Sequence, residues 1–358
     1  MSVIYKAVQW NRQKLIYDAI LLTAVVFYIV IFVDVARLVD SNIELRGVRI
    51  RAFGSAAFIL LHIILSIGPL TRISPKFYPL LYNRRHMGVM MFLLALYHSR
   101  IALIWYHDFG DLTPLIDHDF GKFELLVSLF VSNTYYDTFI RFPFQTLGLA
   151  ALVILFFMAA TSHDFWLANL TAPIWKALHM GVYLAYGLLI GHVVLGALQT
   201  NKHPLLTVMV GVGFVWIVSL HLLAGWREFK RDSRDLAIAG EEFVDIGSLG
   251  EIPEKRAKIV NIAGERVAIF KYDGKVSAVS NVCQHQNGPL GEGKVVDGCI
   301  TCPWHGYQYL PENGASPPPF TEKITTFDVK LQGNRILVKT IPNLPGTPVT
   351  PAVFEEAT

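Results

Sequence analysis

The sequence predicts a bundle of six membrane-spanning α-helices followed by a small all-β domain. The first observation is composition: the 358 residues are 53% hydrophobic with a mean hydropathy of +0.42, whereas ordinary soluble domains are about 45 to 50% apolar. The second is formal charge, which is +6 over residues 1–235 and −3 over residues 236–358. The third is the change, after about residue 240, from long apolar runs to short alternating stretches broken by glycine.

Six apolar runs predict the membrane helices, because about twenty residues are needed to cross a bilayer. They cover residues 16–35, 52–70, 86–106, 142–162, 177–200 and 205–226. The first run is too long for a signal-peptide core and is followed by no small-residue cleavage site. Residues 123–130 are apolar enough for a helix on the membrane surface, although a plain loop fits equally well. Lys and Arg are more frequent on the N-terminal side, which favours both termini and the β domain on the cytoplasmic side of an inner membrane.

The domain boundaries follow from charge and proline. Residues 1–226 form the predicted membrane domain, and residues 227–240 form a charged linker. The β domain is expected over residues 241–340. Residues 341–358 are rich in proline and have little reason to fold. We expect contact with membrane lipid, no nucleic-acid partner and no internal repeat.

Two pairs of cysteine and histidine mark the centre of the β domain. Cys283 and His285 form the first pair, and Cys302 and His305 form the second pair after sixteen intervening residues. Two thiolates and two imidazoles are the ligands of a Rieske [2Fe-2S] centre. A tetrahedral zinc site accepts the same donors, but zinc fingers usually group Cys with Cys and His with His. The glycines that follow each pair fit tight loops over a cofactor.

Over residues 241–340 the chain resembles the Rieske ferredoxin family. The resemblance implies one [2Fe-2S] cluster with the ligands Cys283, His285, Cys302 and His305. In the Rieske proteins of cytochrome bc complexes, a serine that hydrogen-bonds the cluster stands where this chain has Tyr307, and two disulfide-forming cysteines stand where it has Gly288 and Trp304. Because fewer hydrogen bonds to the cluster lower its potential, we expect a low-potential cluster. With no disulfide available, a reducing compartment is expected, and Cys299 is expected to be a small buried apolar residue.

Four histidines of the predicted membrane helices stand at matching depths. His179 and His192 share one helix and are thirteen residues, or about 20 Å, apart; His86 and His98 share another and are about 18 Å apart. The third and fifth helices run parallel, so His86 would face His179 and His98 would face His192. Such pairs suit bis-imidazole ligation of two b-type haems. The alternative is that each histidine hydrogen-bonds a neighbouring helix.

Other polar residues of the membrane domain support or compete with this interpretation. Cations that would neutralise haem propionates are Arg84, Arg85, Arg100 and Lys176. His62 and His221 are alternative ligands, or would line a quinone site. Histidines near helix ends or in loops, which we expect to be solvated, are His107, His118, His163 and His203.

Residues 50–225 resemble the ferric reductase-like transmembrane family. The residues that carry the resemblance are Arg84-Arg85-x-x-Gly88, His98 ten residues beyond that glycine, and Thr161-Ser162 followed by Trp175, His179 and His192. The resemblance implies haem ligation by His98, His179 and His192, whereas members of the family differ at the position of His86. One or two b-type haems are therefore expected.

The absence of two sequence motifs argues against two kinds of enzyme activity for this chain. No G-x-G-x-x-G turn is present, so we expect no NAD(P)H site. A Rieske oxygenase needs a further iron held by two histidines and a carboxylate, and no histidine follows His305. We expect an electron-transfer membrane protein in which a cytoplasmic reductase or ferredoxin reduces the cluster and the haems pass electrons to an acceptor on the far side. The alternative is a membrane-anchored redox sensor or assembly module without electron flow across the membrane.

Overall fold

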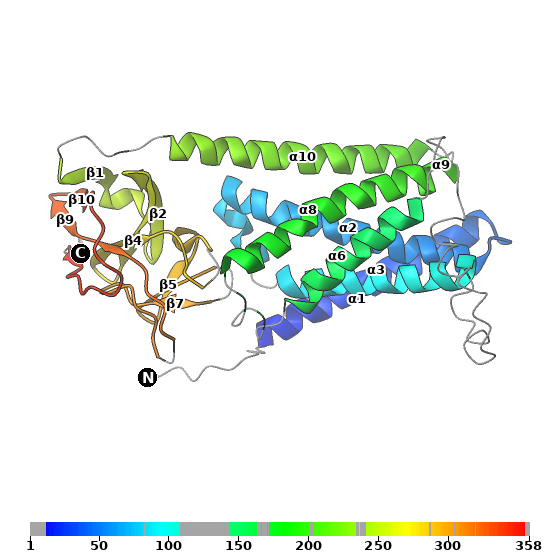
Figure 1. Cartoon of the computed structure of the whole chain (residues 1–358), viewed down its shortest axis with the longest axis horizontal. Helices are drawn as coiled ribbons and strands as arrows, with labels where there is room; N and C mark the ends of the chain where they lie inside the picture. The colour runs from blue at the N-terminus through cyan, green and yellow to red at the C-terminus, as the bar shows by residue number, and fades with distance from the viewer. Residues whose placement is uncertain are drawn as a thin grey trace.

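The computed structural model consists of a helical bundle with a β domain at one end (Figure 1). The structure describes residues 12–81, 84–107, 144–162, 166, 170, 172–200, 204–233, 236, 241–285, 288–303, 306–318 and 320–354. The predicted fold class, a helical membrane bundle followed by a small all-β domain, is confirmed. The predicted surface helix at residues 123–130 lies outside the described residues.

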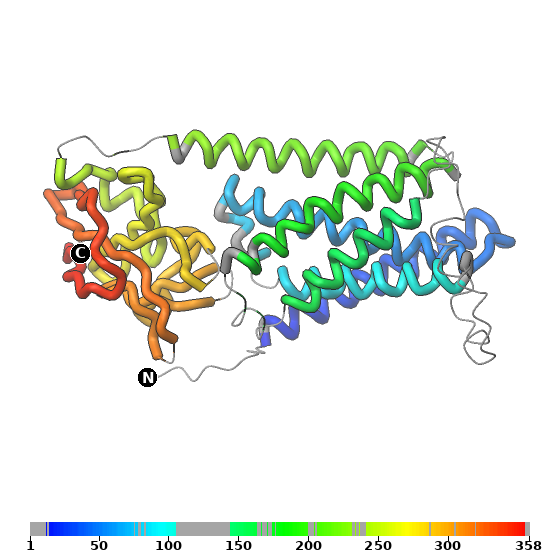
Figure 2. The backbone as a smooth tube through the Cα atoms, viewed as in Figure 1, coloured from blue at the N-terminus to red at the C-terminus, as the bar shows by residue number. Residues whose placement is uncertain are grey.

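Six long helices form the described part of the bundle. They are α1 (Arg12–Val39), α2 (Leu45–Ile73), α3 (Arg84–His107), α6 (Phe144–Ala160), α8 (Ala172–Leu195) and α10 (Pro204–Asp232). Five are long and apolar enough to cross a membrane, and α6 is shorter, with 17 residues. The short helices η1 (Pro75–Leu81) and α9 (Ala197–Thr200) lie between them in the chain. The backbone trace shows the long helices running along a common direction (Figure 2).

The bundle is apolar on its outer surface as well as in its core. Leu61 and Ala151 are fully buried in the core. Phe27, Leu184 and Leu222 are more than half exposed on the outer faces of α1, α8 and α10. Helices that are apolar on all sides suit a lipid environment, because lipid covers the faces that the protein does not. The N-terminal part is therefore an integral membrane domain.

Two helical hairpins, α2 with α3 and α6 with α8, are the most closely packed pairs of the bundle. Gly-x-Ala-Ala occurs in α2 at residues 54–57 and in α6 at residues 148–151. His-Met-Gly-Val occurs in α3 at residues 86–89 and in α8 at residues 179–182. Two short motifs therefore recur in the two hairpins, although the sequence analysis expected no internal repeat. Two short motifs are hard to recognise within apolar helices, because many unrelated membrane helices have a similar composition.

Eleven strands of the described residues form three antiparallel sheets. The strands are β1 (Phe243–Ser248), β2 (Arg256–Ile262), β3 (Glu265–Tyr272), β4 (Lys275–Ser280), β5 (Lys294–Val296), β6 (Cys299–Thr301), β7 (Gln308–Tyr309), β8 (Thr326–Phe327), β9 (Val329–Gln332), β10 (Arg335–Lys339) and β11 (Ala352–Val353). The central sheet has the order β11-β4-β3-β2, with β8 also on β4, and the others are β1-β10-β9 and β5-β6-β7. Two-residue turns with positive φ at both residues join β2 to β3, β3 to β4 and β5 to β6, as tight hairpins require.

The central sheet has a hydrophobic core on each face. Val267 and Ile269 of β3 pack into the core shared with β1 and β10. Ala268 and Phe270 point the other way, into the core that contains Cys283 and other residues of the cysteine loops. Successive residues of a strand face opposite sides. These four side chains are nevertheless all fully buried, because both faces of the sheet are covered. The same rigid strand therefore supports the cysteine loops.

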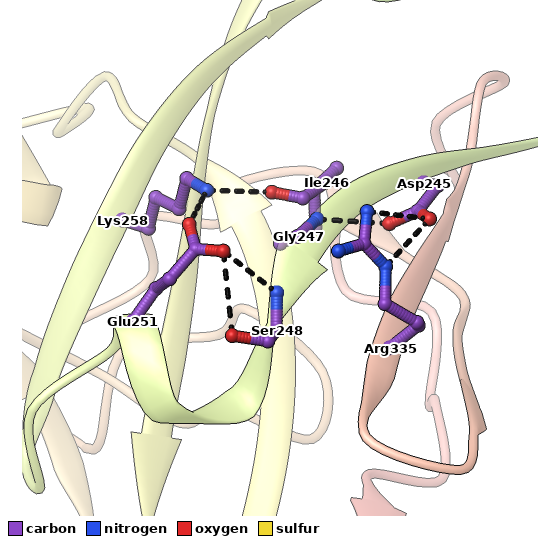
Figure 3. Close-up of polar contacts among 7 residues, drawn as sticks. All are labelled: Asp245, Ile246, Gly247, Ser248, Glu251, Lys258 and Arg335. Carbon is purple, nitrogen blue, oxygen red and sulfur yellow. Dashed lines mark hydrogen bonds and ion pairs between the residues drawn. The ribbon is translucent and has the colours of Figure 1, made fainter.

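Polar contacts hold a bulge in β1 (Figure 3). The register of β1 against β10 shifts between Asp245 and Gly247, and φ at Gly247 is +120°. Asp245 accepts a hydrogen bond from the Gly247 N–H at 2.9 Å and pairs with Arg335 at 2.8 Å. On the adjoining turn, Lys258 pairs with Glu251. Glycine is favoured in this bulge because side chains rarely adopt that φ.

The proline-rich tail is folded, so the expectation that residues 341–358 have little reason to fold is wrong for the described part. The Val349 N–H donates to the Glu312 carbonyl at 2.6 Å, and the Phe354 N–H donates to the Gly274 carbonyl at 3.0 Å. Between these contacts, β11 pairs with β4. Prolines are tolerated here because an edge strand needs to donate only some of its N–H groups.

The predicted linker is also partly wrong, because α10 continues through residues 227–232. Glu228 of α10 is buried and pairs with Arg266 of β3 at 2.8 Å. The Leu236 N–H donates to the Asn261 carbonyl of β2 at 3.0 Å. Charged residues such as Arg, Glu and Lys are good helix formers, so charge alone does not end a helix. The helix therefore reaches the β domain and contacts it.

Candidate functional site

Backbone hydrogen bonds shape the first cysteine loop. The Cys283 N–H donates to the Gly288 carbonyl at 2.9 Å, and the Leu290 N–H donates to the Asn281 carbonyl at 2.9 Å. The Asn281 side chain accepts a further hydrogen bond, from the Gly291 N–H, at 2.7 Å. The loop directs the Cys283 thiol into the core, where the residue is 1% exposed.

The second cysteine loop closes in a similar way. The Cys302 N–H donates to the Tyr307 carbonyl at 2.8 Å, and the Gly306 N–H donates to the Cys302 carbonyl at 3.0 Å. Gly306 has φ +72°, which favours glycine at this turn. Cys302 is buried, and neither cysteine forms a disulfide. Trp304 and His305 lie outside the described residues.

Two tyrosines connect the loops. The Tyr307 ring stacks on His285, with centroids 4.7 Å apart and planes at 8°, and its hydroxyl donates to Glu322. The Tyr309 hydroxyl accepts the Gln284 N–H at 3.0 Å and lies 3.4 Å from Cys283 Sγ. Because that oxygen accepts the hydrogen bond from the Gln284 N–H, its own O–H can donate to the sulfur. Burial, with the neighbouring Cys283, raises the pKa of Tyr309 and keeps it a donor.

Tyr309 is a functional candidate that the sequence analysis missed. A hydrogen bond to a cluster sulfur stabilises the more negative reduced state and raises the potential. The expectation of a low potential rested on Tyr307, whose hydroxyl points to Glu322. The contact between Tyr309 and Cys283 joins residues 26 positions apart, and no local sequence pattern indicates it.

The donor set fits an iron–sulfur cluster. Buried thiols come from both loops, and the first loop supplies the half-exposed imidazole of His285. Thiolate sulfur and imidazole nitrogen are the ligand types of a Rieske centre. No group of three or more metal-ligating side chains is found within the described ranges, which do not include His305. The assignment of Cys283, His285, Cys302 and His305 as ligands therefore stays a prediction. Cys299 is half-buried and forms no disulfide.

His98 of α3 and His192 of α8 meet inside the bundle. Their ring centroids are 6.3 Å apart and their planes lie at 86°. Two imidazoles on opposite sides of one metal ion have centres about 6 Å apart, since each metal–nitrogen bond is about 2 Å. Nδ1 of His98 contacts the Ile50 carbonyl at 2.8 Å, and Nδ1 of His192 contacts the Phe144 carbonyl at 2.9 Å. A ligating histidine usually donates its second N–H in this way, which leaves Nε2 for the metal.

Glycines of α2 and α6 make room for these two rings. A Cβ at Gly54 would lie 2.8 Å from His98 Nδ1, and a Cβ at Gly148 would lie 2.7 Å from His192 Nδ1. A larger residue would displace either ring. These glycines begin the repeated Gly-x-Ala-Ala motif, so the two hairpins contribute equivalent halves of the histidine pair.

His179 lies near the start of α8. Its Nδ1 contacts the Trp175 carbonyl at 3.0 Å, and the indole of Trp175 stacks on its ring at 3.8 Å. Its Nε2 is buried and has no hydrogen-bond partner among the described residues. A buried nitrogen of this kind needs an explanation, and metal ligation is one. Arg84 and Arg85 of α3 lie within electrostatic range of His179, where propionates would need cations.

His86 of α3 pairs with a carboxylate of α1. Its Nδ1 lies 2.7 Å from Asp18 Oδ2, so a metal ligated by His86 would be bound through Nε2. His86 and His179 occupy the same place in the repeated His-Met-Gly-Val motif. Their pairing across one haem stays a prediction.

His62 and His221, the alternative haem ligands, differ in how their ring nitrogens are engaged. His62 has both nitrogens engaged, Nδ1 with the Phe58 carbonyl at 2.8 Å and Nε2 with the Tyr186 hydroxyl at 3.1 Å, so it is poorly suited to a metal. His221 contacts the Ile217 carbonyl through Nδ1 at 2.9 Å. Arg100 is exposed on α3, two residues beyond His98. Predicted solvated histidines outside the described residues are His118, His163 and His203.

Buried thiols on two loops of a β domain, joined to a membrane bundle that contains paired histidines, define the class of this molecule as a membrane-bound redox protein. The Rieske [2Fe-2S] domain model matches residues 242–328, and the model of the ferric reductase like transmembrane component matches residues 52–190. The chain therefore belongs to the Rieske family through its β domain, which follows a ferric reductase-like transmembrane domain. The Rieske domain supports a [2Fe-2S] cluster.

Individual relatives resemble only part of the chain. The ferredoxin component of the alkene monooxygenase system of Xanthobacter autotrophicus is 28% identical over 102 residues, which are 28% of this chain and 84% of that protein. The ferredoxin component of the naphthalene 1,2-dioxygenase system of Pseudomonas aeruginosa is 30% identical over 99 residues, 27% of this chain and 95% of that protein. The solved ferredoxin of carbazole 1,9a-dioxygenase from Nocardioides aromaticivorans is 24% identical, with a TM-score of 0.27, and the match covers 28% of this chain and 100% of that one.

Proposed function

We propose that this protein passes single electrons between a Rieske cluster and two b-type haems in the membrane. The observation that carries the haem assignment is the pair of His98 and His192, whose rings come from the two repeated hairpins and meet at 6.3 Å. The proposed cluster ligands are Cys283, His285, Cys302 and His305. The inner haem would be held by His86 and His179, with Arg84 and Arg85 beside its propionates.

The arrangement of the elements supports a linear path. In Figure 1, β5 and β7, the two outer strands of the sheet β5-β6-β7, lie on the side of the β domain nearest the bundle, and the second cysteine loop joins β6 to β7. The helix α10 ends at the β domain, so α8, which precedes it and runs the opposite way, begins at that end. His179 is therefore nearer the β domain than His192, with about 20 Å between them. Haem and cluster supply reversible one-electron chemistry, and the chain sets their spacing and potentials.

The partners follow from this path and from the charge distribution. The excess of Lys and Arg on the N-terminal side favours a cytoplasmic β domain in an inner membrane. A cytoplasmic reductase or ferredoxin is then the electron donor, and the acceptor lies on the far side. The ferredoxin relatives support a role of the β domain in electron transfer, because each is named as the ferredoxin component of an oxygenase system.

The test is haem b per polypeptide in the detergent-purified protein, measured by a reduced-minus-oxidised spectrum together with iron and acid-labile sulfide. We expect two haems and one cluster. His98→Ala and His192→Ala should each remove one haem and retain the cluster. His62→Ala is the matched control in the same bundle and should retain both haems. A wild-type protein with a cluster and no haem would refute the proposal and favour the sensor alternative.

A further inference from the structure

A carboxylate inside the membrane domain faces one of the proposed haem ligands. Asp18 lies in α1, within the stretch of that helix that is apolar enough to span a membrane. Its Oδ2 is 2.7 Å from His86 Nδ1, with 27% of the Asp18 side chain and 32% of the His86 side chain exposed. An ionisable side chain in a membrane helix is costly and usually marks function. The helix α1 lies before the region that matches the ferric reductase-like family.

The other three proposed ligands make a different contact through Nδ1. His98, His179 and His192 each contact a backbone carbonyl, which carries no net charge. Of these four histidines, His86 is therefore the one whose Nδ1 contacts a carboxylate among the described residues. The two ends of the bundle thus differ in the charge that acts on their ligands.

We propose that Asp18 is a positioning residue that holds Nδ1–H of His86, directs Nε2 toward the inner haem and lowers the potential of that haem. The inference rests on the proposed function. An imidazole that donates to a carboxylate becomes a stronger electron donor at its other nitrogen, and a stronger donor stabilises the oxidised metal. A lower potential at the inner haem would favour electron flow from the inner to the outer site.

Cations near the inner site act in the opposite sense. Arg84 and Arg85 lie within electrostatic range of His179 and would raise the potential of a nearby haem. Both arginines remain when Asp18 alone is changed. A comparison of Asp18 variants therefore isolates the effect of the carboxylate.

The experiment compares Asp18→Asn with Asp34→Asn in the full chain. Asp34 lies on the same helix and is exposed, so its replacement removes the same charge away from His86. The readouts are the midpoint potential of each haem in an optical redox titration and the g-values of each low-spin ferric signal. Asp18→Asn should raise one midpoint and shift one set of g-values, while the other haem stays unchanged. Asp34→Asn should leave both haems as in the wild type.

The possible outcomes separate this inference from the proposed function. Two haems with unchanged midpoints and g-values in Asp18→Asn would overturn the inference and leave the proposed function intact, whereas a wild-type protein without haem would overturn the proposed function itself. If Asp18→Asn loses one haem, Asp18→Glu and His86→Ala decide the matter. Retention in Asp18→Glu with loss of the same haem in His86→Ala supports the inference. Retention of both haems in His86→Ala overturns it.

Discussion

Replacing Tyr309 by phenylalanine tests how the β domain sets the potential of its cluster. The change removes the hydroxyl that lies 3.4 Å from Cys283 Sγ and keeps the buried ring. The hydrogen bond is stronger to the reduced cluster, which carries one more negative charge than the oxidised cluster. The midpoint potential should therefore fall in Tyr309→Phe.

The size of the fall follows from hydrogen-bond energies. A hydrogen bond to a charged group contributes about 1.5 to 3 kcal/mol, and only the difference between the two redox states affects the potential. If that difference is about 1 to 2 kcal/mol, the potential falls by roughly 40 to 90 mV, because 59 mV corresponds to a tenfold change for one electron. The Gln284 N–H also loses its acceptor, at a cost of about 1 kcal/mol in stability.

The assay is a redox titration of the full-length protein followed by the EPR signal of the reduced cluster. Iron and acid-labile sulfide are measured in the same samples to show that the cluster is retained. Tyr307→Phe is the matched control, because its hydroxyl donates to Glu322 while its ring stacks on His285. An unchanged potential in Tyr309→Phe, or an equal fall in Tyr307→Phe, would refute the reasoning.

Two further predictions concern the bundle and the stability of the β domain. Gly148→Val should abolish one haem, because a Cβ there would lie 2.7 Å from His192 Nδ1, whereas Gly187→Val, with nothing within 4 Å of its Cβ, should retain both haems in the reduced-minus-oxidised spectrum. In the network of Figure 3, Glu251 accepts hydrogen bonds from Lys258 and from Ser248. These bonds, of which the one from Lys258 has the largest effect, lower the pKa of Glu251 from 4.5 to about 2. A lowered carboxyl pKa stabilises the fold above pH 4.5, and this contribution is lost as the pH falls toward about 2. Lys258→Met should therefore reduce the acid sensitivity of unfolding in this pH range, measured by circular dichroism, and an unchanged pH dependence would contradict this assignment. The effect should be small, because the Glu251 carboxylate is exposed.

The sequence by itself determined the features that depend on residue type at short range. The spacing of Cys283, His285, Cys302 and His305 indicated an iron–sulfur site, because each pair sits within one short loop and metal ligation permits few residue types. Long apolar runs indicated the membrane helices, because the thickness of the bilayer fixes their length. Helical rise and the parallel course of α3 and α8 predicted histidine pairs at matching depths, and the structure brings His98 and His192 together.

Only the tertiary structure decided which distant residues act on those sites. The contacts of Tyr309 with Cys283, of Asp18 with His86 and of Gly148 with His192 each join different elements of the fold. The proline-rich tail folds because β4 offers it an edge. Helical and strand periodicity describes one element at a time, whereas these contacts depend on how elements pack against one another. The sequence therefore indicated the proposed ligands, and the packing of the helices and loops determined which residues lie against them.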